Sequence, residues 1–105
     1  MSDGRSVSTV STQRCVTQLK VLADSTRLAV VRHLLREPLH VGDLRRFLDV
    51  EQSLLSHHLR VLKDAGIVLD ERDGKSVRYR LAPDVTMAPE GESIHLGCCR
   101  LSFDP

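Results

Sequence analysis

Apolar residues recur every three or four positions through most of the first sixty-five residues, which predicts a series of amphipathic helices. The periodic segments are residues 12–22, 26–36, 41–48 and 52–65. Asp24 or Ser25 is placed to cap the second helix, because short polar side chains accept hydrogen bonds from the first free backbone N–H groups. Glu37-Pro38 ends that helix, since the residue before a proline avoids helical geometry.

Each predicted helix has one apolar stripe that we expect to face the core. Asp49 is expected in the tight turn between the last two helices, and Gly66 as the cap that ends the fourth. The expected core positions are Cys15, Val16, Leu19 and Leu22 in the first helix, Leu28, Val31, Leu34 and Leu35 in the second, Leu44, Phe47 and Leu48 in the third, and Leu55, Leu59 and Leu62 in the fourth.

The period changes after the fourth helix. The pattern predicts two strands, at residues 67–72 and 76–81, and Asp73-Gly74 between them is typical of a hairpin turn. Beyond Ala82, prolines and glycines interrupt the pattern and no long helix is predicted. The expected fold is α+β and mostly helical: a winged helix-turn-helix with four helices, a two-stranded wing and an irregular C-terminal tail.

Length and charge refine this organisation. A chain of 105 residues holds one domain at most, which we divide into a flexible N-terminus (1–11), a winged helix-turn-helix (12–82) and a tail (83–105). Residues 1–81 carry 14 Lys or Arg against 10 Asp or Glu, and residues 82–105 carry one against four. The basic body is typical of a protein with a polyanionic partner.

A helix-turn-helix followed by a basic hairpin predicts binding to double-stranded DNA. The major groove admits one α-helix, whose first turns need short polar groups if the backbone is to approach the bases. The wing would bring cations to the phosphates. The expected DNA-binding residues are Gln52, Ser53, Ser56, His57 and Arg60 of the fourth helix and Arg72, Lys75 and Arg78 of the wing. We expect His58 to be a packing residue instead.

Three stretches together resemble the ArsR/SmtB family of metal-responsive winged helix-turn-helix repressors. They are LADSTRL at 22–28, QSLLSHHLRVLKDAGIV at 52–68, and the wing residues RDGK at 72–75 with YRL at 79–81. The resemblance covers roughly residues 12–82. It implies a homodimer that represses an operator and leaves it when an inducer binds. Separately, the sequence shows no paired carboxylates, phosphate-cradling glycine loop or nucleophile elbow, so we expect no enzymatic activity.

The inducer site departs from the family's familiar patterns. His40 and Gly42 stand where arsenic-responsive members carry a Cys-x-Cys pair, and the tail lacks the long helix that holds zinc ligands in other members. Cys98 and Cys99, with Cys15, remain as soft ligands. The leading prediction is an inducer site for arsenite or antimonite formed by Cys98, Cys99 and Cys15, with Cys15 from the same subunit or from the other one. No permanently bound cofactor is expected.

Several alternatives stay open. His95 with the thiols would suit zinc, cadmium or copper, and the vicinal thiols would also suit redox or sulfide sensing. A different class of function is a winged-helix module that binds protein. No apolar run reaches the roughly 18 residues that span a bilayer, so we expect a cytoplasmic protein without a membrane partner. In that compartment all three cysteines are expected as thiols.

Overall fold

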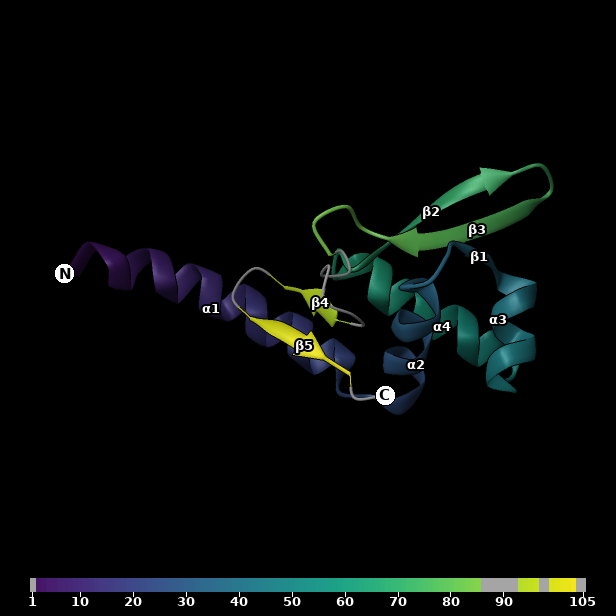
Figure 1. Ribbon diagram of the computed structural model, residues 1–105, viewed down its shortest axis with the longest axis horizontal. Helices are drawn as coiled ribbons and strands as arrows, with labels where there is room; N and C mark the ends of the chain where they lie inside the picture. Colours follow the sequence, from purple (N-terminus) through teal and green to yellow (C-terminus); the bar gives the residue numbers. More distant parts are fainter. Residues whose placement is uncertain (1, 86–92, 97–98, 104–105) are drawn as a thin grey trace.

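A computed structural model describes residues 2–85, 93–96 and 99–103, with side chains from Thr12 onward. Helix α1 projects from one end of the molecule, and a β-hairpin projects from the helical body on another side (Figure 1). The elements, in chain order, are α1 (Ser2–Leu22), α2 (Ser25–Leu34), β1 (Leu39–His40), α3 (Val41–Leu48), α4 (Gln52–Asp64), β2 (Val68–Asp73), β3 (Ser76–Leu81), β4 (Ser93–His95) and β5 (Arg100–Ser102).

Helix α1 is longer than predicted and is turned differently. It begins at Ser2, so residues 2–11, expected as a flexible N-terminus, continue the helix. Its inward face carries Cys15, Gln18 and Leu22, whereas Val16 and Leu19 are 43% and 39% exposed. The predicted stripe of Cys15, Val16, Leu19 and Leu22 is therefore wrong at two positions. The spacing 15, 18, 22 also follows one helix face, and the sequence pattern passed over it because Gln18 is polar.

Asp24 caps α2, as the sequence predicted. Its Oδ1 accepts hydrogen bonds from the backbone N–H groups of Thr26 at 2.9 Å and Arg27 at 3.0 Å. The backbone hydrogen bond from Arg27 is the main cause that lowers the pKa of Asp24, and the positive charges of Arg27 and His58 act in the same direction. The cap therefore stabilises the folded state most when it is ionised.

Replacing Asp24 with alanine is expected to lower the free energy of unfolding by about 1 kcal/mol at pH 7, the usual cost of losing such a cap. Because folding lowers the pKa of Asp24, its charge stabilises the protein above the ordinary value of 3.8 and stops doing so as the pH falls below it. Urea unfolding at pH 7 and pH 3 measures both effects. Asp24→Asn is the control, since it keeps the acceptor without the charge. Equal midpoints for wild type and Asp24→Ala would contradict this role.

The wing is one strand larger than predicted. Strands β2 and β3 pair antiparallel from Val68↔Leu81 to Asp73↔Ser76, and Gly74 in the turn has a φ of +65°. This confirms the predicted hairpin. Strand β1 adds to the other edge of β3, which gives the order β1-β3-β2. Two residues are too few to show an alternating pattern, so β1 was not predicted.

The core lies between α2, α4 and the strands, and it confirms the predicted inner face of α4. Leu55, Leu59 and Leu62 are at most 1% exposed. Phe47 is a correction: it was expected in the core but is 56% exposed, with its ring stacked on that of His33 at 5.0 Å between centroids. Helix α3 ends one residue later, at Leu48. There the Phe47 ring packs on the surface of α2 and does not enter the core.

The described part of the tail is ordered, not irregular as expected. Strands β4 and β5 form an antiparallel hairpin with Ile94 opposite Leu101, and Figure 1 shows it beside α1. Ile94 is fully buried and Leu96 is 7% exposed, while His95 between them is exposed. Such alternation is typical of a half-buried strand. Three residues of it, among prolines and glycines, are too short to predict from the sequence.

Candidate DNA-binding surface and cysteine site

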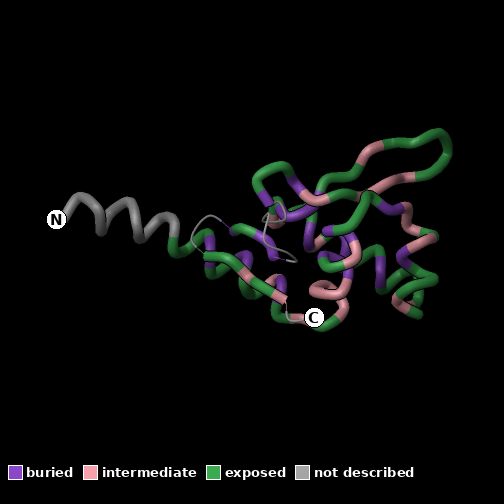
Figure 2. Tube along the Cα trace, viewed as in Figure 1, coloured by how far each residue is buried: buried purple, intermediate pink, exposed green. Residues whose placement is uncertain are grey.

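The two central helices form a helix-turn-helix. Helix α3 ends at Leu48, Asp49 takes the left-handed conformation with a φ of 51°, and α4 begins at Gln52. This confirms the predicted turn. The leucines of α4 fix its inner face in the core, so its opposite face is presented to solvent. Figure 2 shows this division along the helix.

The outer face of α4 brings most of the predicted reading residues together. Ser53, Ser56, His57 and Arg60 are all exposed and line one surface hollow. Ser53 Oγ donates a hydrogen bond to Glu51 Oε1 at 2.6 Å, so the Ser53 hydroxyl proton is not available to another acceptor. Ser56, His57 and Arg60 therefore make the more accessible set of donors.

Gln52, at the first residue of α4, has a neighbour that sequence reasoning missed. Arg45 Nη1 of α3 lies 3.4 Å from Gln52 Oε1, across the helix-turn-helix turn. This contact orients the Gln52 amide and places a second cation beside the outer face of α4. The pair Arg45-Arg46 just before the turn was the available signal, since basic residues there lie close to the start of the next helix.

The two adjacent histidines of α4 have separate environments, as predicted. His57 is exposed, whereas His58 is 7% exposed and its Nδ1 lies 3.1 Å from Arg27 Nη1. The Arg27 Nε donates to the Val21 carbonyl at 2.6 Å. His58 thus joins α4 to the α1–α2 junction. In the described ranges, no group of three His, Cys, Asp or Glu side chains is placed to hold a metal ion.

The wing residues divide into two kinds. Arg72 and Lys75 are exposed near the turn. Arg78 is held by Glu71 across the β2–β3 pair, with Nη2 at 2.6 Å and Nε at 3.1 Å from Oε1. This hydrogen bond and the charge of Glu71 raise the pKa of Arg78. The charge of Arg78 is therefore partly offset, which favours the wing tip as the more cationic end.

The cysteines include the largest departure from expectation. Cys15 is 4% exposed on α1, and it is disulfide-bonded, whereas the sequence predicted a thiol. Its Sγ lies 3.8 Å from the carbonyl oxygen of Leu96, the residue that directly follows β4, so the tail contacts Cys15 there. The prediction relied on the cellular compartment and took no account of this packing, which brings the tail to α1 within one chain.

Two of the other predicted ligands, Cys99 and His95, lie in the described part of the same hairpin. The Cys99 carbonyl accepts a hydrogen bond from the Leu96 N–H at 2.9 Å, and Cys99 is exposed. Cys98 lies outside the described residues. His95 is exposed on β4, and the strand alternation turns its side chain away from the face that carries Leu96. The geometry therefore brings Cys15 against Leu96, directly after β4, and leaves His95 apart.

No helix in the described part of the chain is long and apolar enough to cross a membrane. The model of a family described as "Bacterial regulatory protein, arsR family" matches residues 24–69. That segment runs from the Asp24 cap through α4 into β2. It therefore contains the helix-turn-helix and leaves α1 and the tail outside.

Individual proteins match over more of the chain. The "Arsenical resistance operon repressor" of Escherichia coli is 47% identical over 68 residues, which are 63% of this chain and 57% of that protein. The "HTH-type transcriptional regulator NmtR" of Mycobacterium tuberculosis is 43% identical over 86 residues, 75% of this chain and 71% of that protein. The crystal structure of the transcriptional regulator HlyU from Vibrio vulnificus has a TM-score of 0.68 at 30% identity, covering 78% of this chain and 84% of that one.

Proposed function

This chain belongs to the ArsR family of bacterial regulatory proteins, and from that premise we propose that it is a dimeric repressor of transcription. In this proposal it binds operator DNA in the cytoplasm and releases it when a thiophilic inducer binds. The observation that carries the proposal is the exposed polar face of α4, where Ser56, His57 and Arg60 line one hollow while the opposite face is fixed in the core. The name of the E. coli relative supports the role of repressor.

The proposed reading surface has the chemistry that a major groove requires. Ser56 and His57 lie in the first two turns of α4, where short or planar polar groups let the backbone approach the base edges. Arg60 lies one turn further along and reaches a base or a phosphate. The exposed Arg72 and Lys75 of the wing would contact phosphates, which contribute affinity without reading sequence.

Arg60→Ala is expected to weaken binding to an operator by roughly 1–3 kcal/mol, the cost of losing a side chain that reads a base. The matched control is Lys63→Ala, which also removes one cation from α4. Lys63 Nζ is held by Asp70 at 3.0 Å, so its removal should change affinity much less. Fluorescence anisotropy on a duplex selected by the protein from a random library measures both.

The same titrations test the alternative class, a winged-helix module that binds protein. Binding to DNA phosphates releases counterions, so affinity should fall steeply as salt is raised. Equal affinities for wild type and Arg60→Ala would remove Arg60 from the reading surface. If no duplex is bound at low salt, the repressor proposal fails and the protein-binding module is favoured.

The proposed dimer uses α1. Val16 and Leu19 are exposed apolar residues on this helix, beside the face that carries the buried Cys15 and Gln18. A second copy of α1 would cover them, and burial of such apolar area favours association. This places the dimer contact and the candidate inducer site on the same helix.

For the inducer we propose arsenite or antimonite. The support is the contact between α1 and the tail hairpin, where Cys15 lies against Leu96 and the turn carries Cys99. Trivalent arsenic favours three sulfur ligands, and Cys98 would be the third. The inducer requires Cys15 as a thiolate, so it would bind the reduced protein. Release of DNA needs only that the metalloid bind the DNA-free form more tightly.

A redox or sulfide sensor is the second candidate, and the disulfide at Cys15 favours it. Two thiols would lose two electrons and two protons to an oxidant such as a peroxide, and the new S–S bond would fix the tail on α1. A zinc, cadmium or copper inducer is less well supported than these two. Its site would need His95 together with the thiols, and the His95 side chain is exposed on the other face of β4.

A further inference from the structure

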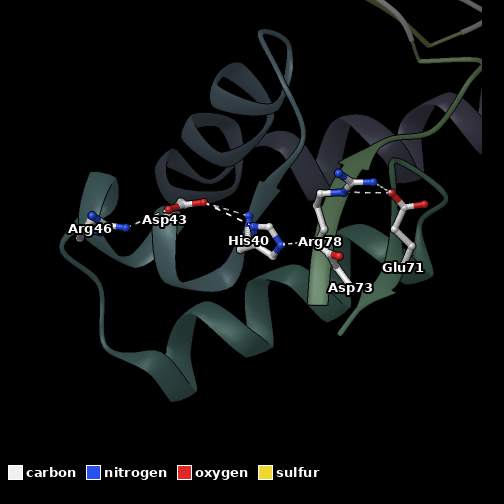
Figure 3. Close-up of polar contacts among 6 residues, drawn as sticks. All are labelled: His40, Asp43, Arg46, Glu71, Asp73 and Arg78. Carbon is white, nitrogen blue, oxygen red and sulfur yellow. Dashed lines mark hydrogen bonds and ion pairs between the residues drawn. The ribbon is translucent and has the colours of Figure 1, made fainter. Parts of the chain in front are cut away.

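His40 stands at the junction of the wing and the helix-turn-helix. It ends strand β1, where it pairs with Arg78 of β3, and it directly precedes α3. Its backbone N–H donates to Asp43 Oδ2 at 3.3 Å, so the first turn of α3 folds back on it. Figure 3 shows its ring between two carboxylates from different elements.

Each ring nitrogen of His40 faces one carboxylate. Nε2 lies 2.8 Å from Asp73 Oδ2, and Nδ1 lies 3.7 Å from Asp43 Oδ2. Asp73 is the last residue of β2, immediately before the wing turn, whereas Asp43 belongs to α3. The ring therefore links the end of the wing to the helix that precedes the DNA-facing α4.

We propose that His40 is a positioning residue that holds the wing on the helix-turn-helix and makes operator binding depend on pH. The proposal rests on the proposed function in one respect, namely that the wing tip contacts DNA. A wing already held in its bound position loses less conformational freedom on binding, and affinity rises accordingly. His40 itself need not touch DNA.

The charges around the ring set the direction of the pH dependence. An imidazolium hydrogen-bonds to Asp73 through Nε2 at 2.8 Å, and its positive charge is also attracted by Asp43, 3.7 Å from Nδ1. The neutral ring has no charge to offer either carboxylate. Histidine is the side chain that ordinarily changes charge between pH 5 and 8. The link should therefore be tighter at pH 6 than at pH 8.

The neighbouring cations do not reverse this expectation. Arg46 Nη2 is bound to Asp43 Oδ1 at 2.9 Å, on the other oxygen from the one that faces His40. Arg78, the strand partner of His40, directs its guanidinium to Glu71 at 2.6 Å. Figure 3 shows both cations turned to these carboxylates and away from the ring.

The test compares operator affinity at pH 6 and pH 8 for wild type, His40→Gln, Asp73→Asn and the double variant. The wild type should lose roughly two- to fivefold more affinity between these pH values than His40→Gln, a range set by a half-exposed ion pair. Asp73→Asn should lower the pH response in the same way, and the double variant should lower it no further. Other histidines, including His57, remain in every variant and cancel in the comparison.

Two outcomes would overturn the proposal. One is the same pH response in wild type and His40→Gln, with both proteins shown to be folded by circular dichroism. The other is found with Lys75→Ala: if it changes neither affinity nor salt dependence, the wing tip does not contact DNA and that part of the proposed function fails as well. If Lys75→Ala weakens binding but the pH responses match, only the role of His40 fails.

Discussion

Replacing Cys15 with serine is expected to give a protein that still binds its operator but no longer releases it when arsenite is added under reducing conditions. Cys15 lies on α1 against Leu96 and does not line the hollow formed by Ser56, His57 and Arg60 of α4, so the proposed reading surface should be unchanged. Loss of one of three sulfur ligands should remove most of the metalloid affinity. Anisotropy of a labelled operator during an arsenite titration measures the effect.

Controls separate the two candidate signals. A metalloid site needs three sulfurs, whereas a disulfide needs two. A variant that keeps Cys15 and one of Cys98 and Cys99 should therefore ignore arsenite, and it should still respond to an oxidant if redox sensing is the function. Release of the operator by Cys15→Ser at the wild-type arsenite concentration would exclude Cys15 as a ligand.

Ile94→Ala is expected to lower the free energy of unfolding by about 2–5 kcal/mol, as truncation of a buried isoleucine usually does. Ile94 is fully buried on β4 and belongs to the same core as Leu55 and Leu59 of α4. In a domain stabilised by about 5–15 kcal/mol in all, that loss is large. Urea unfolding followed by circular dichroism measures it.

Ser102→Ala on the neighbouring strand is the matched control. Ser102 is exposed on β5, and such surface changes usually stay within about 0.5 kcal/mol. A similar small effect for Ile94→Ala would mean that the hairpin does not stabilise the core. A large effect would mean that the hairpin packs into the core that supports α4.

The elements with long periodic patterns or strong turn residues were predicted well. Helix α3 has the predicted bounds, α4 differs by one residue at its end, and the wing hairpin was placed by Asp73-Gly74. These signals are local. The inner face of α4 followed because three leucines at helical spacing leave one way to bury them.

What the sequence missed depends on contacts between distant segments. Gln18 is buried on α1 although it is polar, and its Oε1 has no hydrogen-bond partner among the described residues. Phe47 is exposed although it is aromatic. The β4–β5 hairpin and β1 are too short to produce a period of their own. In each case, tertiary packing decided the outcome instead of local preference.

The candidate site divides in the same way. The shared exposure of the proposed reading residues of α4 could be predicted because they lie on one helix whose other face is buried. The disulfide at Cys15 could not be predicted, because the expected cellular compartment favoured a thiol. The charge pairing of Arg78 with Glu71 could not either, since it depends on the register of two strands. The same holds for the position of His40 between Asp43 and Asp73.

The most direct test of the proposed repressor is a titration of the reduced wild-type protein on its operator with arsenite. We predict tight binding without the metalloid and a loss of affinity in the range of about 5- to 150-fold when it is bound, the usual span of coupling between two sites. An affinity that stays the same with arsenite, antimonite and an oxidant would show that the chain is not an inducible repressor of this kind.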